Sequence, residues 1–150
     1  MPRKKVAPEN EIEDILGRLE GAKQAFVDAL EATPHESFET SRGEDESVKR
    51  IVERTVDDIN FYFGRLVSRA LNLPQPPCLG RADLGSLREG SMAFQVAHRR
   101  FTNLLHDLLP EDLEKVAADP DLGTYTLRQV LELTAAQYNQ RAQHVRKLSA

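Results

Sequence analysis

The sequence predicts an all-α fold, an up-down four-helix bundle with a long crossover between its second and third helices. Four segments carry apolar residues at three- and four-residue spacing, which is the period of a helix that buries one face. Prolines and polar stretches separate these segments, and none shows the alternation of a half-buried strand, so we expect no sheet. The length of 150 residues favours one domain. We expect that domain over residues 9–150, behind a flexible basic arm over residues 1–8.

The first two helices flank a proline-containing link. Periodicity predicts the first over Glu9–Ala32, and Pro34 ends it because a proline excludes the helical conformation of the residue before it. Ser47 is the expected cap of the second helix, since its hydroxyl can accept a hydrogen bond from the first helical turn. That helix should end near Leu73-Pro74. Its inward stripe comprises Val48, Ile51, Val52, Thr55, Ile59, Tyr62, Phe63, Leu66 and Ala70.

The third and fourth helices follow a proline-rich crossover. Periodicity predicts the third over Gly85–Leu109, closed by Pro110, and the fourth over Thr126–Leu148. Residues 111–115, between these two helices, indicate a short helix or turn.

Charge and composition argue against several kinds of partner. The formal net charge is -4 at pH 7, so no broad positive field steers the chain toward nucleic acid or a membrane surface, and we expect neither partner. Cys78 is the only cysteine and allows no intramolecular disulfide. The sequence contains neither an apolar run of membrane-spanning length nor the apolar core of a signal peptide. We therefore expect a cytoplasmic protein.

Two short motifs at their joint spacing make the chain similar to a known family. The second helix opens with SVKRIV (residues 47–52), and the fourth is reached through LGTYTLRQVL (residues 122–131). With the order of the helices, these motifs resemble the DinB/YfiT-like four-helix bundle family over nearly the whole chain. The resemblance implies a bundle that is often a homodimer, with one histidine of the second helix and two of the fourth binding a divalent metal. It also implies that some relatives are thiol-dependent transferases or related metalloenzymes.

The resemblance places the family's metal ligands at residues that are not histidines. Carried over position by position, the second-helix ligand falls at Arg54, with Asp57 in the acidic position after it, and the fourth-helix pair falls at Gln137 and Arg141. A cationic arginine has no lone pair for a metal, and an amide oxygen is a weak neutral ligand. Glu46 also replaces the tryptophan usual before the second-helix serine. We therefore expect no metal cofactor.

Other histidines offer an alternative metal site. Such a displaced site would combine His98 or His144 with Asp57 or Glu53 and hold a divalent metal such as zinc or nickel. A histidine on the inner face of a helix is more often a hydrogen-bonded core residue than a ligand, which is the competing interpretation of His98.

The replacing residues themselves suggest an anion site. Arg54 and Arg141 would approach one cleft, where two guanidinium groups and the Gln137 amide can hold a carboxylate or phosphate through charge-assisted hydrogen bonds. In the competing interpretation, Arg141 pairs with Asp57 or Asp58 across the bundle while Arg54 extends its charged head to water.

Two classes of function follow. The favoured hypothesis is a homodimeric, non-catalytic binding or interaction protein that takes a small anionic ligand in the former metal cleft. The alternative is a thiol-dependent transferase or a metal-dependent enzyme with rearranged ligands, for which no catalytic residue can be assigned. The consecutive aromatics Phe61-Tyr62-Phe63 cannot all face one side of a helix, so we expect at least one to be exposed or to lie at a subunit contact.

Overall fold

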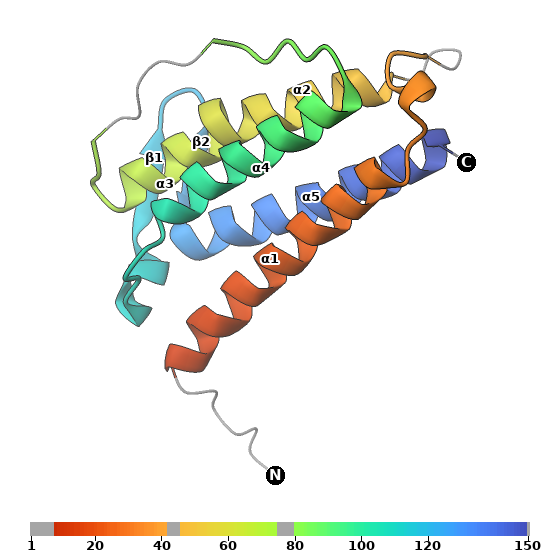
Figure 1. Cartoon of the computed structure of the whole chain (residues 1–150). Coiled ribbons are helices and arrows are strands. Elements are labelled where there is room, and N and C mark those ends of the chain that lie inside the picture. Colours follow the sequence, from red (N-terminus) through yellow and green to blue (C-terminus); the bar gives the residue numbers. More distant parts are fainter. Residues whose placement is uncertain (1–7, 42–45, 75–79, 150) are drawn as a thin grey trace.

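The computed structural model describes residues 8–41, 46–74 and 80–149, and its long helices form a four-helix bundle (Figure 1). The bundle helices are α1 (Pro8–Glu31), the continuous run α2 (Val48–Asp58) to α3 (Gly64–Ala70), α4 (Leu87–Asn103) and α5 (Leu127–Ser149). The predicted all-α class is confirmed. The basic arm before Pro8 and the thiol of Cys78 lie outside the described residues. No helix in the described part of the chain is long and apolar enough to span a membrane.

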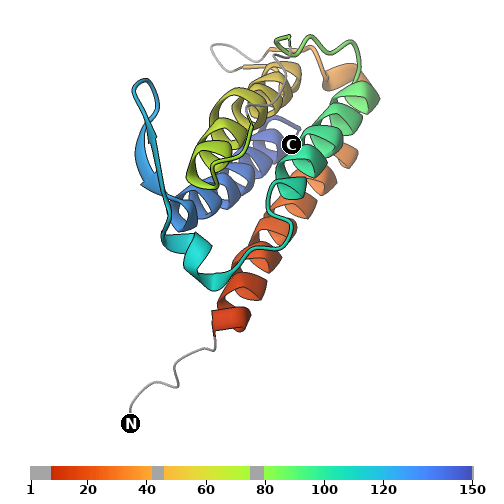
Figure 2. The same ribbon diagram turned by 90° about the vertical axis from the view of Figure 1, so that its left-hand side faces the viewer.

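The crossover between α3 and α4 sets the topology of the bundle. It returns the chain to the end where α2 began, so α4 runs parallel to α2 and α3 (Figures 1 and 2). Gly90 of α4 consequently packs against Val52 in the first turns of α2. α5 runs parallel to α1, and their C-terminal ends meet where the hydroxyls of Thr33 and Ser149 lie 3.0 Å apart. The α1–α5 pair therefore forms one layer, and α2–α3 with α4 forms the other.

The second bundle helix contains a change of helical type at its centre. Ser47 caps its start as predicted, because its Oγ accepts a hydrogen bond from the Arg50 amide at 3.2 Å. Residues Ile59–Phe63 then form a π-helical segment, after which the Gly64 amide donates to the Ile59 carbonyl. A Cβ at Gly64 would lie 2.8 Å from that carbonyl oxygen, so the widened turn needs a glycine. Asn72, at a φ of 53°, ends the helix in a left-handed conformation.

The third bundle helix is shorter than the predicted Gly85–Leu109. It ends at Asn103, and a turn follows in which Asp107 has a φ of 60°. The amides of Leu104 and His106 bond three residues back instead of four, so the helix tightens into a turn that the left-handed Asp107 closes before Pro110, which the apolar periodicity through Leu108 does not reveal. The short helix predicted after Pro110 is confirmed as a 3₁₀ helix over Pro110–Glu114.

The expectation of no strand was wrong. Strands β1 (Val116–Asp119) and β2 (Gly123–Thr126) form an antiparallel hairpin just before α5. Its strands have four residues each, and the inward positions of β1 are a small alanine and an acid, so alternation carries no apolar signal. Gly123, with a φ of 104°, begins β2 in a conformation that favours glycine.

A buried carboxylate fastens this hairpin to the bundle. Asp119 lies 2.7 Å from Arg65 Nε and 2.8 Å from Arg69 Nε, both on α3, and its side chain has no solvent exposure. Burial acts to raise the pKa of Asp119, but hydrogen bonds from the backbone amides of Asp121 and Leu122 and the two arginines outweigh it and lower the pKa. The hairpin is thus positioned by charge pairing rather than by a large apolar face.

The core of the bundle is aromatic where the two layers meet. Phe26 of α1, Phe94 of α4 and Tyr138 of α5 are fully buried, with Phe94 contacting the other two edge-on at ring-centroid distances of 4.6 and 5.1 Å. Such edge-to-face contacts add to the free energy of apolar burial and fix the relative rotation of three helices. That rotation determines which residues of α5 face α2.

Candidate functional site

A cleft between the start of α2 and the C-terminal half of α5 brings together three of the predicted site residues. Its volume is about 410 Å³, within the range of small-molecule pockets. Arg54 reaches it from α2, and Gln137 and Arg141 reach it from α5, as their one-turn spacing predicts. His144 also lines it. The complete lining is Glu46, Arg54, Gln137, Gln140, Arg141, Gln143, His144 and Lys147.

Arg141 is held at the back of the cleft by α2. Its guanidinium lies 2.7 Å from Asp58 Oδ2 and donates a hydrogen bond of 3.0 Å to Thr55 Oγ1. Its side chain is 12% exposed and that of Asp58 is 33% exposed. Burial lowers the pKa of Arg141, and the Asp58 carboxylate opposes this by stabilising the cation. Of the two interpretations of Arg141, pairing across the bundle is therefore the one observed, with Asp58 as the partner.

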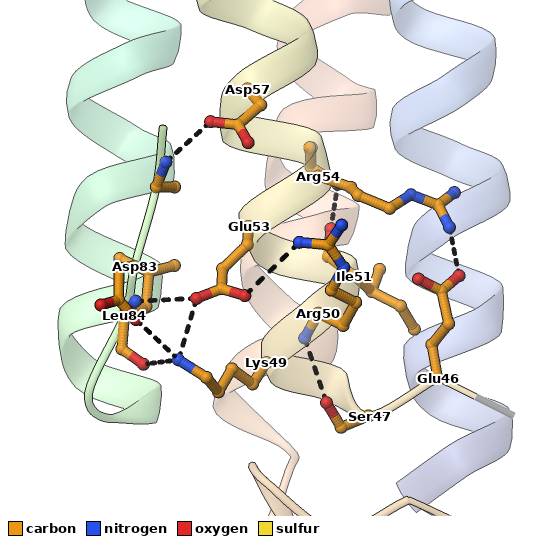
Figure 3. A network of polar contacts seen from close by, with 12 residues as sticks. Glu46, Ser47, Lys49, Arg50, Ile51, Glu53, Arg54, Asp57, Asp83 and Leu84 are labelled. Carbon is orange, nitrogen blue, oxygen red and sulfur yellow. Dashed lines mark hydrogen bonds and ion pairs between the residues drawn. The ribbon is translucent and has the colours of Figure 1, made fainter. Parts of the chain in front are cut away.

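Arg54 lies at the mouth of the cleft and does not extend freely to water. Its guanidinium is ion-paired with the carboxylate of Glu46, the residue just before the α2 cap (Figure 3). The Arg54 side chain is 44% exposed and that of Glu46 is 31% exposed. An ion pair this open to water contributes on the order of 0.2–1 kcal/mol. The pair therefore forms part of the wall of the cleft, and Arg54 holds the Glu46 carboxylate only weakly.

The remaining lining is rich in hydrogen-bonding groups and positive charge. The cleft is lined by three cations, Arg54, Arg141 and Lys147, and one carboxylate, Glu46, while Asp58 outside the lining pairs with Arg141. The buried Oε1 of Gln137 has no hydrogen-bond partner among the described residues, and an unpaired buried polar atom costs roughly 1–3 kcal/mol. The cations of the lining suit an anion better than a cation or an apolar molecule, and the Gln137 oxygen can accept a hydrogen bond from a donor on a ligand or from water.

Asp57 does not share this cleft, which corrects the expectation from the sequence. It points to the opposite side of α2, where its Oδ1 accepts a hydrogen bond of 2.8 Å from the Ala82 amide of the crossover (Figure 3). One turn earlier, the buried Glu53 accepts from the Leu84 amide and from Lys49 Nζ, both at 2.9 Å. These carboxylates hold the crossover against α2, so they serve the fold rather than the cleft.

His98 is a core residue and does not line the cleft. Its Nδ1 lies 3.0 Å from Tyr138 Oη and its Nε2 lies 2.8 Å from Glu20 Oε1. The neutral imidazole satisfies both contacts when Nε2 donates to the carboxylate and Nδ1 accepts from the phenol. Burial lowers the pKa of His98, and the hydrogen bond to Glu20 only partly offsets this. Neither ring nitrogen has a lone pair available for a metal in this arrangement.

The three aromatic residues of the π-helical segment make contacts within the chain. Phe63 is buried, whereas Phe61 and Tyr62 are partly buried. The Arg81 guanidinium of the crossover lies 4.2 Å from the centroid of the Phe61 ring. Tyr62 Oη lies 3.4 Å from Tyr125 Oη, and this contact, with burial, raises the pKa of Tyr62 to about 12. Phe61 and Tyr62 are thus partly buried rather than exposed, and the alternative expectation, that one of the three residues lies at a subunit contact, stays a prediction.

Sequence reasoning missed several residues of the cleft. Gln140, Gln143 and Lys147 belong to the same stripe of α5 as Gln137 and Arg141, and extending the three- and four-residue spacing along α5 would have found them. Glu46 was noted only as a departure from the family pattern. Its ion pair with Arg54 depends on the backbone path before the cap, for which the sequence carries no signal.

The donor set of the cleft does not fit the divalent metal that the resemblance implies. Two of the three ligand positions hold guanidinium groups, which cannot coordinate a cation, and the third offers an amide. His144 is the single imidazole in the lining, and Glu46 is engaged by Arg54. Across the described parts of the chain, no three His, Cys, Asp or Glu side chains gather as a metal site requires.

Comparison with known proteins identifies the fold. The structure is similar to that of YfiT from Bacillus subtilis, described as a probable metal-dependent hydrolase with an unusual four-helix bundle topology. The TM-score is 0.72 at 19% sequence identity, and the similarity covers 99% of this chain and 91% of YfiT. Neither a protein-family model nor a curated protein matches the sequence. At 19% sequence identity, the similarity establishes the fold of this chain but not its activity. The chain has the four-helix bundle fold of YfiT.

Proposed function

We propose that this chain is a non-catalytic binding protein, and that the cleft between α2 and α5 binds a small anionic ligand instead of a metal. The observation that carries the proposal is the composition of the cleft: Arg54, Arg141 and Lys147 share it with glutamine amides and a single carboxylate. Guanidinium and ammonium groups recognise carboxylates and phosphates through charge-assisted hydrogen bonds.

The chemistry of the same residues argues against the activity suggested for YfiT. Metal-dependent hydrolysis needs a bound cation that activates water, and such a cation needs lone-pair donors. The two arginines supply none and would also repel it. For the same reason we favour binding over the alternative of an enzyme with rearranged metal ligands.

Lys147 offers the cleanest test, because its neighbour is a matched control. Lys147 lines the cleft, whereas the exposed Arg146 does not, although both stand in the last turns of α5. We expect millimolar acetate, succinate or phosphate to raise the melting temperature of the wild type, since a ligand that binds only the folded state stabilises it. The Lys147→Ala variant should lose most of this shift, and Arg146→Ala should keep it.

The contrary outcomes are as clear. Equal shifts in both variants would place anion binding elsewhere on the surface.

Metal content is the second test. Protein purified without chelator and without a histidine tag, then incubated with zinc, nickel and manganese, should show no stoichiometric metal by elemental mass spectrometry. Occupancy near one metal per chain would overturn the proposal and favour the enzyme alternative.

We also infer a homodimer, as the resemblance implies. Support comes from a groove of about 490 Å³ along α2 and α4, in which five of the ten lining side chains are apolar, among them the exposed Met92 and Val96. Sedimentation velocity would decide this point, because a monomer at micromolar concentration contradicts the inference.

A further inference from the structure

Glu46 places a carboxylate of the protein inside the proposed anion site. It lines the cleft and pairs with the Arg54 guanidinium (Figure 3). It also lies close enough to Arg141 to stabilise that cation and oppose the lowering of its pKa. The two arginines of the cleft therefore already have a carboxylate beside them in the absence of any ligand.

The backbone at Glu46 is anchored while its side chain is not. The next residue, Ser47, is buried and caps α2: the Arg50 amide donates to its Oγ at 3.2 Å, and the Ile51 amide donates to its carbonyl at 3.1 Å. From this fixed point the Glu46 side chain reaches Arg54, which stands about two helical turns further along. The contact thus relies on two long, partly exposed side chains, which can separate without disturbing the cap.

The two arginines differ in how firmly they are engaged. Arg141 is mostly buried and makes separate contacts with Asp58 and Thr55. Among the described residues, Glu46 is the one hydrogen-bond and ion-pair partner of the Arg54 side chain. An incoming anion can therefore replace the partner of Arg54 at a lower cost in free energy than the partners of Arg141.

We propose that the Glu46 carboxylate is an internal occupant of the cleft, and that the ligand is a small organic carboxylate which displaces Glu46 from Arg54. This inference rests on the proposed anion-binding function. It names the ligand as a carboxylate because the Arg54 guanidinium already binds one, through Nη1 to Glu46 Oε1, and a planar guanidinium can bind a free carboxylate through two nitrogens. With Arg141 neutralised by Asp58, the cleft offers Arg54 and Lys147, which suits one or two negative charges.

The test compares carboxylate affinity in wild type and in Glu46→Gln, which removes the competing charge at nearly constant shape. Because an exposed ion pair is worth at most about 1 kcal/mol, the Kd of acetate or succinate should fall by roughly three- to fivefold in titration calorimetry. Glu39→Gln is the matched control: Glu39 is exposed on the same α1–α2 connection and does not line the cleft, and its substitution should leave the Kd unchanged.

A second variant separates displacement from a general gain of positive charge. In an Arg54→Lys background the cleft keeps its charge but loses the guanidinium fork, so adding Glu46→Gln should change the Kd less than twofold. An equal gain in both backgrounds would overturn the displacement and leave anion binding standing. Inorganic phosphate bound more tightly than either carboxylate would overturn the ligand class. Absence of binding in wild type and in Glu46→Gln would refute the proposed function and this inference with it.

Discussion

The guanidinium of Arg141 on α5 lies 2.7 Å from the carboxylate of Asp58 on α2, and this pair joins two helices across the cleft. Arg141 also donates to Thr55, whose hydroxyl in turn donates to the Ile51 carbonyl at 2.7 Å. These contacts link Arg141 to α2 from Ile51 to Asp58, the residue before the π-helical segment. A position that the family resemblance assigns to a metal ligand is therefore occupied by a cation with a structural partner of its own.

Removing the guanidinium should destabilise the fold. We expect Arg141→Met to lower the free energy of unfolding by about 2 kcal/mol, because the largely buried pair is broken and Asp58 is left without its partner. Urea denaturation measures the change. Arg146→Ala, on the exposed side of the same helix, should stay within about 0.5 kcal/mol of wild type. Adding Asp58→Asn to Arg141→Met should recover part of the loss, and a full additive loss would show that the two side chains are not coupled.

Two glycines should respond to alanine in opposite directions. Gly64→Ala places a Cβ 2.8 Å from the Ile59 carbonyl oxygen, so we expect a loss of about 1–3 kcal/mol in the free energy of unfolding. Gly17 lies inside α1 with nothing within 4 Å of an added Cβ, and Gly17→Ala should stabilise by about 0.5–1 kcal/mol. Thermal denaturation followed by circular dichroism distinguishes the two signs. A stabilised Gly64→Ala would mean that the turn converts to an ordinary α-helix at no cost.

His98 should make stability depend on pH below neutrality. Burial lowers its pKa below the ordinary 6.5, so the unfolded chain binds more protons between the two pKa values, and the free energy of unfolding rises with pH in that range. The stability that the neutral His98 ring contributes is fully present above about pH 7, and it is lost as the pH falls through 6.5 toward the pKa of His98 in the folded protein. Glu20, Lys23 and Tyr138 face this ring and modulate the effect.

Urea denaturation at several pH values between 5 and 7.5 tests this dependence. His98→Gln should flatten the slope in this window, whatever its effect on absolute stability. The carboxylates of Asp112 and Asp119, whose pKa values are lowered, act only at more acidic pH and do not overlap it. A slope that is the same in the variant as in wild type would assign the dependence to another group.

The helices could be predicted from the sequence because their signals are local. Apolar spacing, the Ser47 hydroxyl and the prolines act within one or two turns, and the helices begin and end close to the expected residues wherever such a signal exists. The third bundle helix was predicted too long because the chain leaves the α-helix after Asn103 in a turn that the left-handed Asp107 closes, and apolar spacing carries no signal for this turn. The hairpin was missed because an ion pair of Asp119, rather than an apolar face, positions it.

The candidate site could be predicted only in part because its geometry depends on the rotation of whole helices. Gln137 and Arg141 share the cleft because a helical turn separates them, which is local information. Asp57 and Asp58 are adjacent, and only the packing of α2 between the crossover and α5 decides that Asp58 meets Arg141 while Asp57 meets Ala82. Periodicity also assumes an α-helix throughout, whereas the π-helical segment Ile59–Phe63 that follows α2 changes the helical register before α3 begins.

The spacing of two carboxylates on α2 matches the spacing of the two crossover amides that they hold. Glu53 and Asp57 are separated by one turn of α2, a rise of about 6 Å. They accept hydrogen bonds from the amides of Leu84 and Ala82, which are alternate residues of a nearly extended segment and so about 6.6 Å apart. Each carboxylate should therefore protect one particular amide from exchange with solvent.

Hydrogen exchange measured by nuclear magnetic resonance tests this one-to-one assignment. Glu53→Ala should speed exchange at Leu84 by roughly 10- to 100-fold, since a hydrogen bond to a charged group is worth about 1.5–3 kcal/mol, and Asp57→Ala should do the same at Ala82. Each variant serves as the control for the other, because a general loosening of the crossover would accelerate both amides equally in both. Equal acceleration would show that the carboxylates act on the whole segment and that the spacing match does not determine how the crossover lies on α2.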